Sequence, residues 1–373
     1  MLAVAALSAR VLVEAAALDG LRTVALDLFG DADTQRHADQ WRAIGEPGSM
    51  RVDDQRLLDA LGELAATGAV RGWVAGSGFE GRPDLLERGA DLLPLIGTAP
   101  SDWRRVRDPQ AFFAVLRAQG VGFPAVVFDA PASTVGWLSK DAGGCGGWQV
   151  RRASPDDRAG AGRYWQRERT GQPMSATFVA NGRDARLLGV NRQLTRTAGE
   201  RPFLFCGVIG PLTVSDALWR ELAAIVHLLA GEFRVRGLAS LDFLLDGDTV
   251  EVLELNPRPP ASLALYPRIG ERGPLSAHVR ACQQGELPPA LEADGIVRGS
   301  EIVFAAQALQ IDAACAARIE GIEGSRDLPR AGTFCAAGDP LCSLVAEGRD
   351  EDDTRQQLAR RREALRAVLE TTT

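Results

Sequence analysis

The sequence predicts a mixed α/β protein that begins with a small parallel sheet and continues with further strands, among them a hairpin. Strand and helix patterns alternate over the first hundred residues, a glycine-rich loop follows the only lysine, and an acidic hairpin lies further along the chain. Hydrophobic residues make up 46% of the 373 residues and charged residues 24%. These values are typical of a globular protein, and the length suffices for two or three domains with a large core.

The N-terminal part alternates between the two kinds of pattern. We expect strands at Leu2–Leu7, Thr23–Phe29 and Val70–Ala75, and helices at Ala9–Leu18 and Asp53–Thr67. A βαβ order of this kind makes the strands parallel. No G-x-G-x-x-G follows the first strand, so the dinucleotide-binding fingerprint is missing. The turn Gly76-Ser77-Gly78 is either a tight turn alone or one wall of a ligand crevice.

The rest of the chain has longer strands and fewer helices. We expect helices at Asp108–Gln119, Ser215–Gly231 and Asp352–Glu370, a hairpin at Leu238–Leu255, and strands at Ala176–Ala180, Arg186–Gln193, Glu301–Ile311, Thr333–Ala336 and Ser343–Ala346. Ser215 is the expected N-cap of its helix. These patterns divide the chain into an N-terminal α/β domain (1–98), a central domain (99–287) and a C-terminal β segment with a terminal helix (288–373).

Charge and cysteine content exclude several classes of protein. The formal net charge of −7 argues against a general nucleic-acid binder, which needs a basic face. The six cysteines have no CxxC spacing and the three histidines are far apart, so a zinc site is not expected. The apolar start is too short for a membrane span or a signal peptide. We therefore expect a cytoplasmic protein that binds neither nucleic acid nor membrane.

The hairpin Leu238–Leu255 carries the strongest chemical signal. Side chains alternate between the faces of a strand, so Val250, Val252, Glu254 and Asn256 are expected to share one face. A two-residue turn would place Asp242 opposite Glu251, on the wrong face.

A three-residue loop at Asp246–Asp248 makes Asp242 and Glu254 diagonal neighbours, with Asn256 one pleat further. Oxygen ligands without histidine or cysteine suit Mg²⁺ or Mn²⁺. The alternative is an ordinary solvated hairpin, which the apolar flanking residues disfavour.

A second signal surrounds Lys140. The chain has 42 basic residues, and Lys140 is the only lysine among them. The loop after it contains Gly143, Gly144, Gly146 and Gly147 and reads as strand, loop, strand, without the GKS/T of a P-loop. A compact ammonium beside flexible backbone N–H groups suits nucleotide phosphates, although a plain flexible hairpin would look the same.

Taken in order, these segments resemble the ATP-grasp superfamily over roughly residues 100–285. The resemblance implies an ATP-grasp fold, preceded by a Rossmann-like parallel-sheet domain. It implies that Lys140 and the glycine loop bind ATP phosphates, and that Asp242, Glu254 and Asn256 hold two Mg²⁺ ions. It also places the adenine hinge at Gln166, Arg167, Glu168 and Arg169. Arg258 is expected to meet the transferred phosphate, and Arg107 to replace a second lysine that the family usually has.

The flanking motifs resemble a narrower group, the ATP-grasp proteins of methanopterin-linked one-carbon metabolism, including the tyramine–glutamate ligases of methanofuran synthesis. The motifs are Ser8-Ala9-Arg10, the run Asp27–Thr34, Gly76-Ser77-Gly78-Phe79-Glu80 and Asn256-Pro257-Arg258-Pro259-Pro260. The resemblance implies a ligase that activates a carboxylate as an acyl phosphate for attack by an amine.

Two alternatives remain open. One is an ATP-dependent carboxylase of the kind found in purine synthesis, and the other is a non-catalytic nucleotide-binding protein. Arg192, Arg196 and Arg201 are candidates for binding a substrate, or else belong to a solvated loop. The sequence identifies neither the acid nor the amine, and it leaves a homodimer open.

Overall fold

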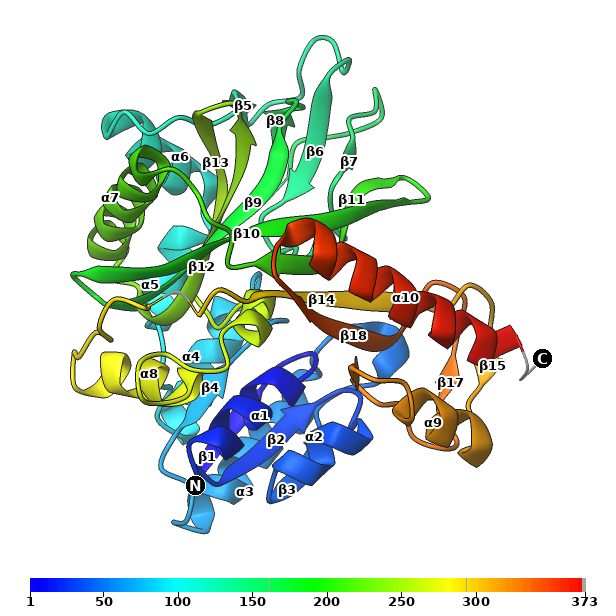
Figure 1. Cartoon of the computed structure of the whole chain (residues 1–373). Helices are drawn as coiled ribbons and strands as arrows, with labels where there is room; N and C mark the ends of the chain where they lie inside the picture. Colours follow the sequence, from blue (N-terminus) through cyan, green and yellow to red (C-terminus); the bar gives the residue numbers. More distant parts are fainter. Residues whose placement is uncertain (161, 293, 371–373) are drawn as a thin grey trace.

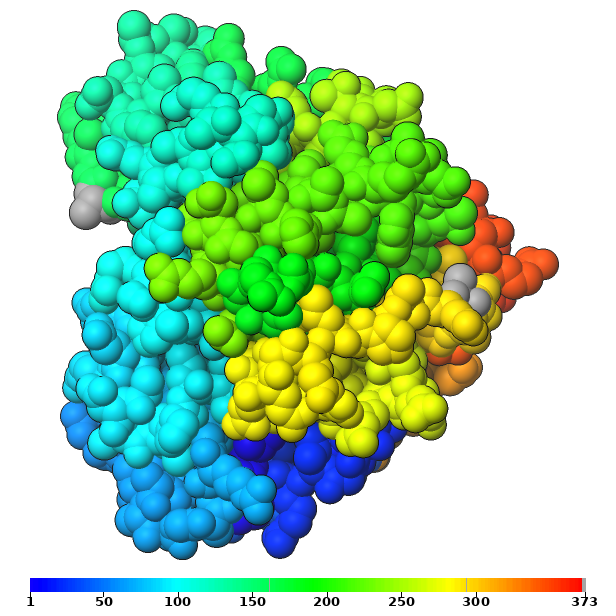
Figure 2. Space-filling model, turned by 90° about the vertical axis from the view of Figure 1, so that its left-hand side faces the viewer, coloured from blue at the N-terminus to red at the C-terminus, as the bar shows by residue number. Residues whose placement is uncertain are grey.

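The computed structural model describes residues 1–160, 162–292 and 294–370, and it confirms the mixed α/β architecture. A parallel sheet lies at the bottom of Figure 1, a large antiparallel sheet crosses the middle, and a small antiparallel sheet stands at the top. In Figure 2 the cyan residues that follow the N-terminal domain run up one face of the molecule and join its lower and upper parts. Among the described residues, no helix is long and apolar enough to cross a membrane.

The N-terminal sheet has the strand order β3-β2-β1-β4, and its neighbouring strands are parallel. Its elements are β1 (Leu2–Ala5), α1 (Arg10–Leu18), β2 (Thr23–Asp27), α2 (Ala32–His37), β3 (Gln40–Ala43), η1 (Pro47–Ser49), α3 (Asp54–Ala66), β4 (Trp73–Ala75) and α4 (Pro83–Leu92). Leu2 and Val4 pack with helix α1, whereas Ala3 and Ala5 pack with α3 and α4. Both faces of the sheet are therefore covered, as is usual for parallel strands.

The middle of the molecule contains two antiparallel sheets. The smaller has the order β5-β8-β6-β7 and the larger the order β13-β12-β9-β10-β11-β14-β18-β16. The strands are β5 (Val126–Val127), β6 (Trp137–Asp141), β7 (Arg151–Arg152), β8 (Arg163–Arg167), β9 (Gln172–Asn181), β10 (Ala185–Ala198), β11 (Arg201–Gly210), β12 (Arg236–Asp246), β13 (Thr249–Asn256), β14 (Val297–Phe304), β16 (Ser325–Arg326) and β18 (Pro340–Gly348).

The C-terminal strands β14, β18 and β16 extend the larger sheet beyond β11, so they share its hydrogen-bonded ladder. The remaining elements are α5 (Pro100–Val106), α6 (Pro109–Ala118), α7 (Asp216–Glu232), η2 (Ala261–Leu265), α8 (Pro274–Gln283), β15 (Leu309–Gln310), α9 (Ala313–Glu320), β17 (Phe334–Cys335) and α10 (Glu351–Glu370). Residues 293 and 371–373 of the predicted C-terminal segment lie outside the described residues. The three-part division of the chain stays a prediction.

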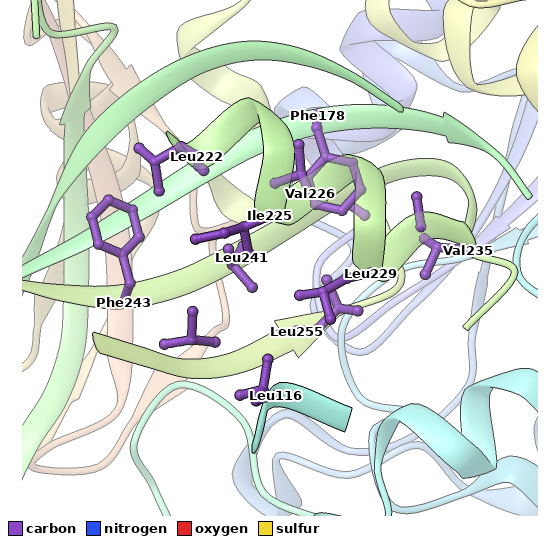
Figure 3. Close-up of a cluster of buried hydrophobic side chains, with 14 of the residues drawn as sticks. Leu116, Phe178, Leu222, Ile225, Val226, Leu229, Val235, Leu241, Phe243 and Leu255 are labelled. Carbon is purple, nitrogen blue, oxygen red and sulfur yellow. The ribbon is translucent and has the colours of Figure 1, made fainter. Parts of the chain in front are cut away.

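Helix α7 covers one face of the larger sheet. Its Leu222, Ile225, Val226 and Leu229 meet Phe178 of β9, Leu241 and Phe243 of β12 and Leu255 of β13 (Figure 3). Ser215 caps the helix as predicted, because its side chain accepts a hydrogen bond from the backbone N–H of Leu218. Since this face of β12 is filled by α7, the intervening residues of the strand point to the other side of the sheet.

A buried histidine ties helix α8 to this sheet. His278 Nδ1 accepts a hydrogen bond from the backbone N–H of Leu238 at 2.9 Å, and Nε2 lies 2.9 Å from the carbonyl oxygen of Ile96. The ring therefore carries its proton on Nε2. Its close neighbour Gly237 has φ +81, and a Cβ there would lie 2.3 Å from Nδ1, so the position requires glycine. Burial lowers the pKa of His278 to about 4 from its usual 6.5.

This histidine should make stability depend on pH. The unfolded chain binds a proton below pH 6.5, whereas the folded chain binds it only near pH 4. The stabilisation from the neutral ring is therefore complete above pH 6.5 and is lost as the pH falls toward 4. We expect a loss of about 3 kcal/mol over this interval. Urea unfolding of wild type and His278→Gln measures it: the variant should be less stable at pH 7.5 but flatter with pH. The exposed His227→Gln should keep the wild-type profile, and an unchanged slope in His278→Gln would contradict the assignment.

Candidate active site

The acidic hairpin brings its oxygen ligands together, but not through the predicted loop. Asp246 pairs with Thr249 across a two-residue turn, and a bulge at Leu253 shifts the register further along the hairpin. As a result Asp242 lies directly opposite Glu254, not diagonal to it.

The predicted common face on β13 is wrong for the same reason. Val250 and Val252 lie in the core with Leu255, while Glu254 and Asn256 line a cavity on the other side of the sheet. The extra residue reverses the alternation of faces, which is what a β-bulge does. The bulge therefore lets one strand supply core side chains at its start and polar ligands at its end.

The two carboxylates face each other with an amide between them. Asn256 Nδ2 donates to Asp242 Oδ2 at 3.2 Å and to Glu254 Oε1 at 3.3 Å. Burial, and then the negative charge of Glu254, raise the pKa of Asp242 to about 7, despite a hydrogen bond from Gln193. Two acids and one amide that converge at one point of the hairpin are a donor set suited to Mg²⁺ or Mn²⁺.

Two basic side chains, Arg107 and Lys140, lie close enough to Glu254 to affect its pKa. Burial alone would raise the pKa of Glu254, but Arg107 and Lys140 together lower it below its usual value. Arg107 Nη1 lies 3.3 Å from Glu254 Oε2, and the arginine side chain is only 9% exposed. Lys140 Nζ donates to Gln166 Oε1 at 3.0 Å. The structure thus places both predicted cations beside the predicted ligands.

The glycine-rich loop lies between β6 and β7, as predicted, and is fastened at several points. Arg107 donates to the carbonyl oxygens of Ala142, through Nε at 3.0 Å, and of Gly144 at 2.8 Å. The backbone N–H of Phe205 donates to Gly146 at 2.9 Å. A Cβ on Gly81 would lie 2.6 Å from Cα of Gly143, so the loop also contacts the N-terminal domain closely. The loop is therefore closed over the carboxylates.

Arg258 joins the N-terminal domain to this centre. Its Nε donates to Glu80 Oε1 at 2.7 Å and its Nη2 lies 2.6 Å from the same oxygen. The Glu80 side chain is 2% exposed and accepts a second hydrogen bond from the backbone N–H of Gly78. The sequence left the role of the turn Gly76-Ser77-Gly78 open. In the structure this turn leads to Glu80, the partner of Arg258. Glu80 and Gln193 were not assigned roles from the sequence; an acid beside glycines after a buried strand was the only signal, and for Gln193 there was none.

The predicted hinge connects the two antiparallel sheets. Gln166 and Arg167 lie in β8 of the small sheet, and residues 168–171 lead into β9 of the large one. Gln166 is buried with its side chain turned to Lys140, and Glu168 and Arg169 pair with Arg152 and Glu251.

The other three candidate arginines do not line the cavity beside the carboxylates. Arg192 is paired with Glu351 of α10, and Arg196 stacks on Phe304 with 3.8 Å between its guanidinium carbon and the ring centre. Arg201 stacks on Trp148 and donates to its carbonyl oxygen. Each of them has a structural contact.

A cavity of about 310 Å³ adjoins the carboxylates. It lies where the N-terminal domain, the large sheet and the C-terminal strands meet. Six charged side chains line it, four acidic and two basic: Asp31, Asp242, Glu254, Asp327, Arg10 and Arg258. Much of the remaining lining is apolar.

Comparison with known proteins accounts for this arrangement. Residues 107–262 match the family model described as an ATP-grasp domain. This part of the chain is therefore similar to ATP-grasp domains. The matched segment includes Arg107, Lys140, the glycine loop and the acidic hairpin.

Solved structures share the fold of the whole chain. The N5-carboxyaminoimidazole ribonucleotide synthetase of Thermus thermophilus is 16% identical, with 98% of each chain covered and a TM-score of 0.68. The L-amino acid ligase of Bacillus licheniformis is 14% identical, with 97% of each chain covered and a TM-score of 0.69. Biotin carboxylase of Campylobacter jejuni, solved with an ATP analogue, is 13% identical, covers 95% of this chain and 89% of its own, and has a TM-score of 0.69. No curated protein sequence matches the chain. Identities this low establish the ATP-grasp fold alone.

Arg107 should control the mobility of the ATP-grasp loop. In Arg107→Ala the carbonyls of Ala142 and Gly144 lose their donor. We expect several-fold faster amide hydrogen exchange across residues 142–150, because the loop then opens more often. Arg104→Ala, which removes an exposed arginine of helix α5 just before Arg107, should leave this exchange unchanged. Equal exchange in wild type and Arg107→Ala would show that other contacts hold the loop.

Proposed function

We propose that this protein is an ATP-dependent ligase that activates a carboxylate as an acyl phosphate for attack by an amine. One observation carries the proposal: Arg107, Lys140 and Arg258 surround the Asp242–Glu254 pair beneath a glycine-rich loop, next to a partly apolar cavity. This combination supplies positive charge for a triphosphate and a separate space for a second substrate.

Each group has a distinct part in this scheme. Lys140 and Arg107 neutralise phosphate oxygens, and the closed loop keeps water from a reactive acyl phosphate. Arg258, held by Glu80 at the cavity wall, orients the carboxylate or the departing phosphate. Asp242, Glu254 and Asn256 would hold Mg²⁺ or Mn²⁺, which would screen the negative charge of the phosphates. The hinge at Gln166–Arg169 would bind adenine, because it joins the two sheets between which the loop closes.

The alternative is an ATP-dependent carboxylase, which the fold of N5-carboxyaminoimidazole ribonucleotide synthetase favours. The charges in the cavity argue against a phosphorylated substrate of that kind. At the end of the cavity away from the proposed metal ligands, Arg10 is already paired with Asp327. Asp31 and Asp327 at that end would repel a phosphate ester. A substrate without a phosphate group fits this cavity better.

We further propose a place in one-carbon cofactor synthesis, with glutamate and tyramine as the first acid and amine to test. The support is the resemblance of four short motifs to proteins of that metabolism, together with the location of these motifs at the cavity. Arg10, Asp31, Ser77 and Arg258, which belong to the four motifs that suggested the narrower group, all line the cavity. A cytoplasmic homodimer is the setting that we propose for the enzyme.

The phosphate-binding assignment has a direct kinetic test. We expect Lys140→Met and Glu254→Gln each to lower magnesium-dependent ADP formation by about a hundred-fold or more, because each removes a charge beside the reacting phosphates. Lys140→Arg should be nearly as defective, since a broad planar group replaces a point charge. Asp248→Asn, in the exposed turn of the same hairpin, should retain wild-type turnover. Full activity in Glu254→Gln would favour a non-catalytic nucleotide-binding protein.

The reaction type has a separate test. ADP formation should require a carboxylic acid and an amine together, and mass spectrometry should detect the amide that joins them. Tyramine with glutamate is the first pair, followed by a panel of other acids and amines. ADP formation that depends on bicarbonate and needs no other acid would instead support the carboxylase. If tyramine and glutamate give no amide, that substrate pair is excluded, and the panel of other acids and amines then tests whether the protein is a ligase at all.

A further inference from the structure

The cavity beside the ATP-grasp centre has a second acidic region. Asp31 and Asp327 line it together with Ser8 and Ser343, and they come from the N-terminal domain and the C-terminal strands. Asp27 and Asp33 lie close enough to Asp31 to raise the pKa of its carboxyl group. None of these residues belongs to the hairpin or to the glycine loop.

Three of these four acids already accept hydrogen bonds from other parts of the protein. Asp27 accepts hydrogen bonds from the backbone N–H groups of Ala9 and Gly30 and from the indole of Trp41. Asp33 accepts from the backbone N–H groups of residues 327 and 328. Asp327 accepts from Arg10 at 2.8 Å and from Ser8 at 3.1 Å. Their carboxylates have structural partners.

Asp31 differs from its neighbours. It is 8% exposed and lines the cavity, yet its carboxylate makes no hydrogen bond or ion pair with any residue that the structure describes. Aspartate is a favoured helix N-cap, and Asp31 occupies that position before α2, but its side chain makes no capping bond. A buried carboxylate without a partner is costly to a protein, so a structural role does not explain it.

The loop that carries Asp31 has two close contacts at Gly30. Asp27 binds the backbone N–H of Gly30, and Gly30 has φ +59 with Trp41 so close that a Cβ would lie 2.5 Å from its ring. Glycine is therefore required one residue before Asp31. The geometry holds Phe29 and Asp31 at the cavity wall in advance of any ligand.

The charge at this end is separate from the proposed metal ligands. Burial and then Asp327, Asp27 and Asp33 raise the pKa of Asp31 well above its usual value, with Arg10 opposing them. The pKa of Asp242 is raised instead by burial and by Glu254, with Gln193 and Arg258 opposing them. Within residues 1–160, 162–292 and 294–370, no group of three or more histidine, cysteine, aspartate or glutamate side chains is arranged to hold a metal ion. Asp33 and Asp327 already have partners, which leaves the single carboxylate of Asp31, and one carboxylate suits an ammonium group better than a metal ion that takes several oxygen ligands.

We propose that Asp31, supported by Asp327, is a subsite for the ammonium group of the substrate that occupies this cavity. The inference rests on the proposed ligase function and narrows its substrate class. The substrate carries a primary ammonium that stays unreacted, and an apolar section lies along Phe29, Phe205 and Phe304 between this ammonium and the reacting group. Amino acids and diamines belong to this class, whereas simple fatty acids and monoamines do not.

Matched probe pairs test the subsite without knowledge of the natural substrate. One pair is 6-aminohexanoate and heptanoate, and the other is 1,5-diaminopentane and hexylamine. In each pair a methyl group replaces an ammonium of similar size, so an apolar cavity without a cation subsite would favour the methyl compound. Calorimetric titration of the full chain at pH 8 should show the ammonium compound of at least one pair binding about ten-fold more tightly.

Variants assign this preference to Asp31. Asp31→Asn should abolish it, Asp31→Glu should restore part of it, and Asp129→Asn, at an exposed loop aspartate, should keep it. The melting temperature provides a second readout. Replacing an acid with a structural role lowers the melting temperature, whereas replacing an acid that only binds ligand leaves it unchanged or raises it. Asp31→Asn should melt at or above the wild-type temperature, since no partner is lost and a buried charge is removed.

The outcomes separate the two proposals. Ammonium preference that is absent in wild type, or unchanged in Asp31→Asn, overturns the subsite, as does a failure of every ammonium probe to bind. A clear drop in the melting temperature of Asp31→Asn would also overturn it by revealing a structural role. If wild type forms ADP with an acid and an amine but shows no preference, the ligase stands and the subsite fails. If the preference is present but no acid and amine support ADP formation, the cation subsite stands and the ligase fails.

Discussion

The structure depends on the placement of two carboxylates, Asp242 and Glu254, directly opposite each other inside the protein. Such a pair is unfavourable by itself, and the raised pKa of Asp242 reflects this. The surrounding chain compensates with Arg107, Lys140 and the amide of Asn256. These charges come from the end of α5, from β6 and from β13, which are far apart in sequence. Positive charge collected around two acids is also what a metal-bound triphosphate needs, so one arrangement serves both the fold and the proposed chemistry.

The N-terminal and C-terminal parts contribute the walls of the second space. Glu80 binds Arg258 across the domain boundary, and Arg10 binds Asp327 from the other end of the chain. Buried ion pairs of this kind are costly to break, so they fix the relative position of the parts that surround the cavity. The cavity is therefore defined by long-range pairs, and its shape depends on the whole chain and not on the ATP-grasp domain alone.

Sequence patterns predicted the local elements and the identity of the central acids. Periodicity identified most of the parallel-sheet domain, and the N-cap at Ser215 followed from residue chemistry. Strand β3, with the exposed sequence Gln40–Ala43, has no alternation that would mark it as a strand. The bulge at Leu253 could not be predicted either, because the segment around it contains no glycine and reads as a regular strand. Its cause lies in tertiary structure: β13 must bury Val252 and Leu255 while presenting Glu254 to the cavity.

The contacts of Arg107 could not be predicted from the sequence either, because they too depend on tertiary structure. Arg107 precedes an ordinary helix, and only folding reveals that it connects Glu254 to the carbonyls of the glycine loop. In this closed arrangement Arg107 occupies the space between the loop and the carboxylates. If a triphosphate binds there as proposed, it would take over the charge of Arg107 and of Lys140, and Ala142 and Gly144 would lose their donor. The proposed nucleotide binding and the movement of the loop would then be coupled through one side chain, because the guanidinium of Arg107 already holds the loop.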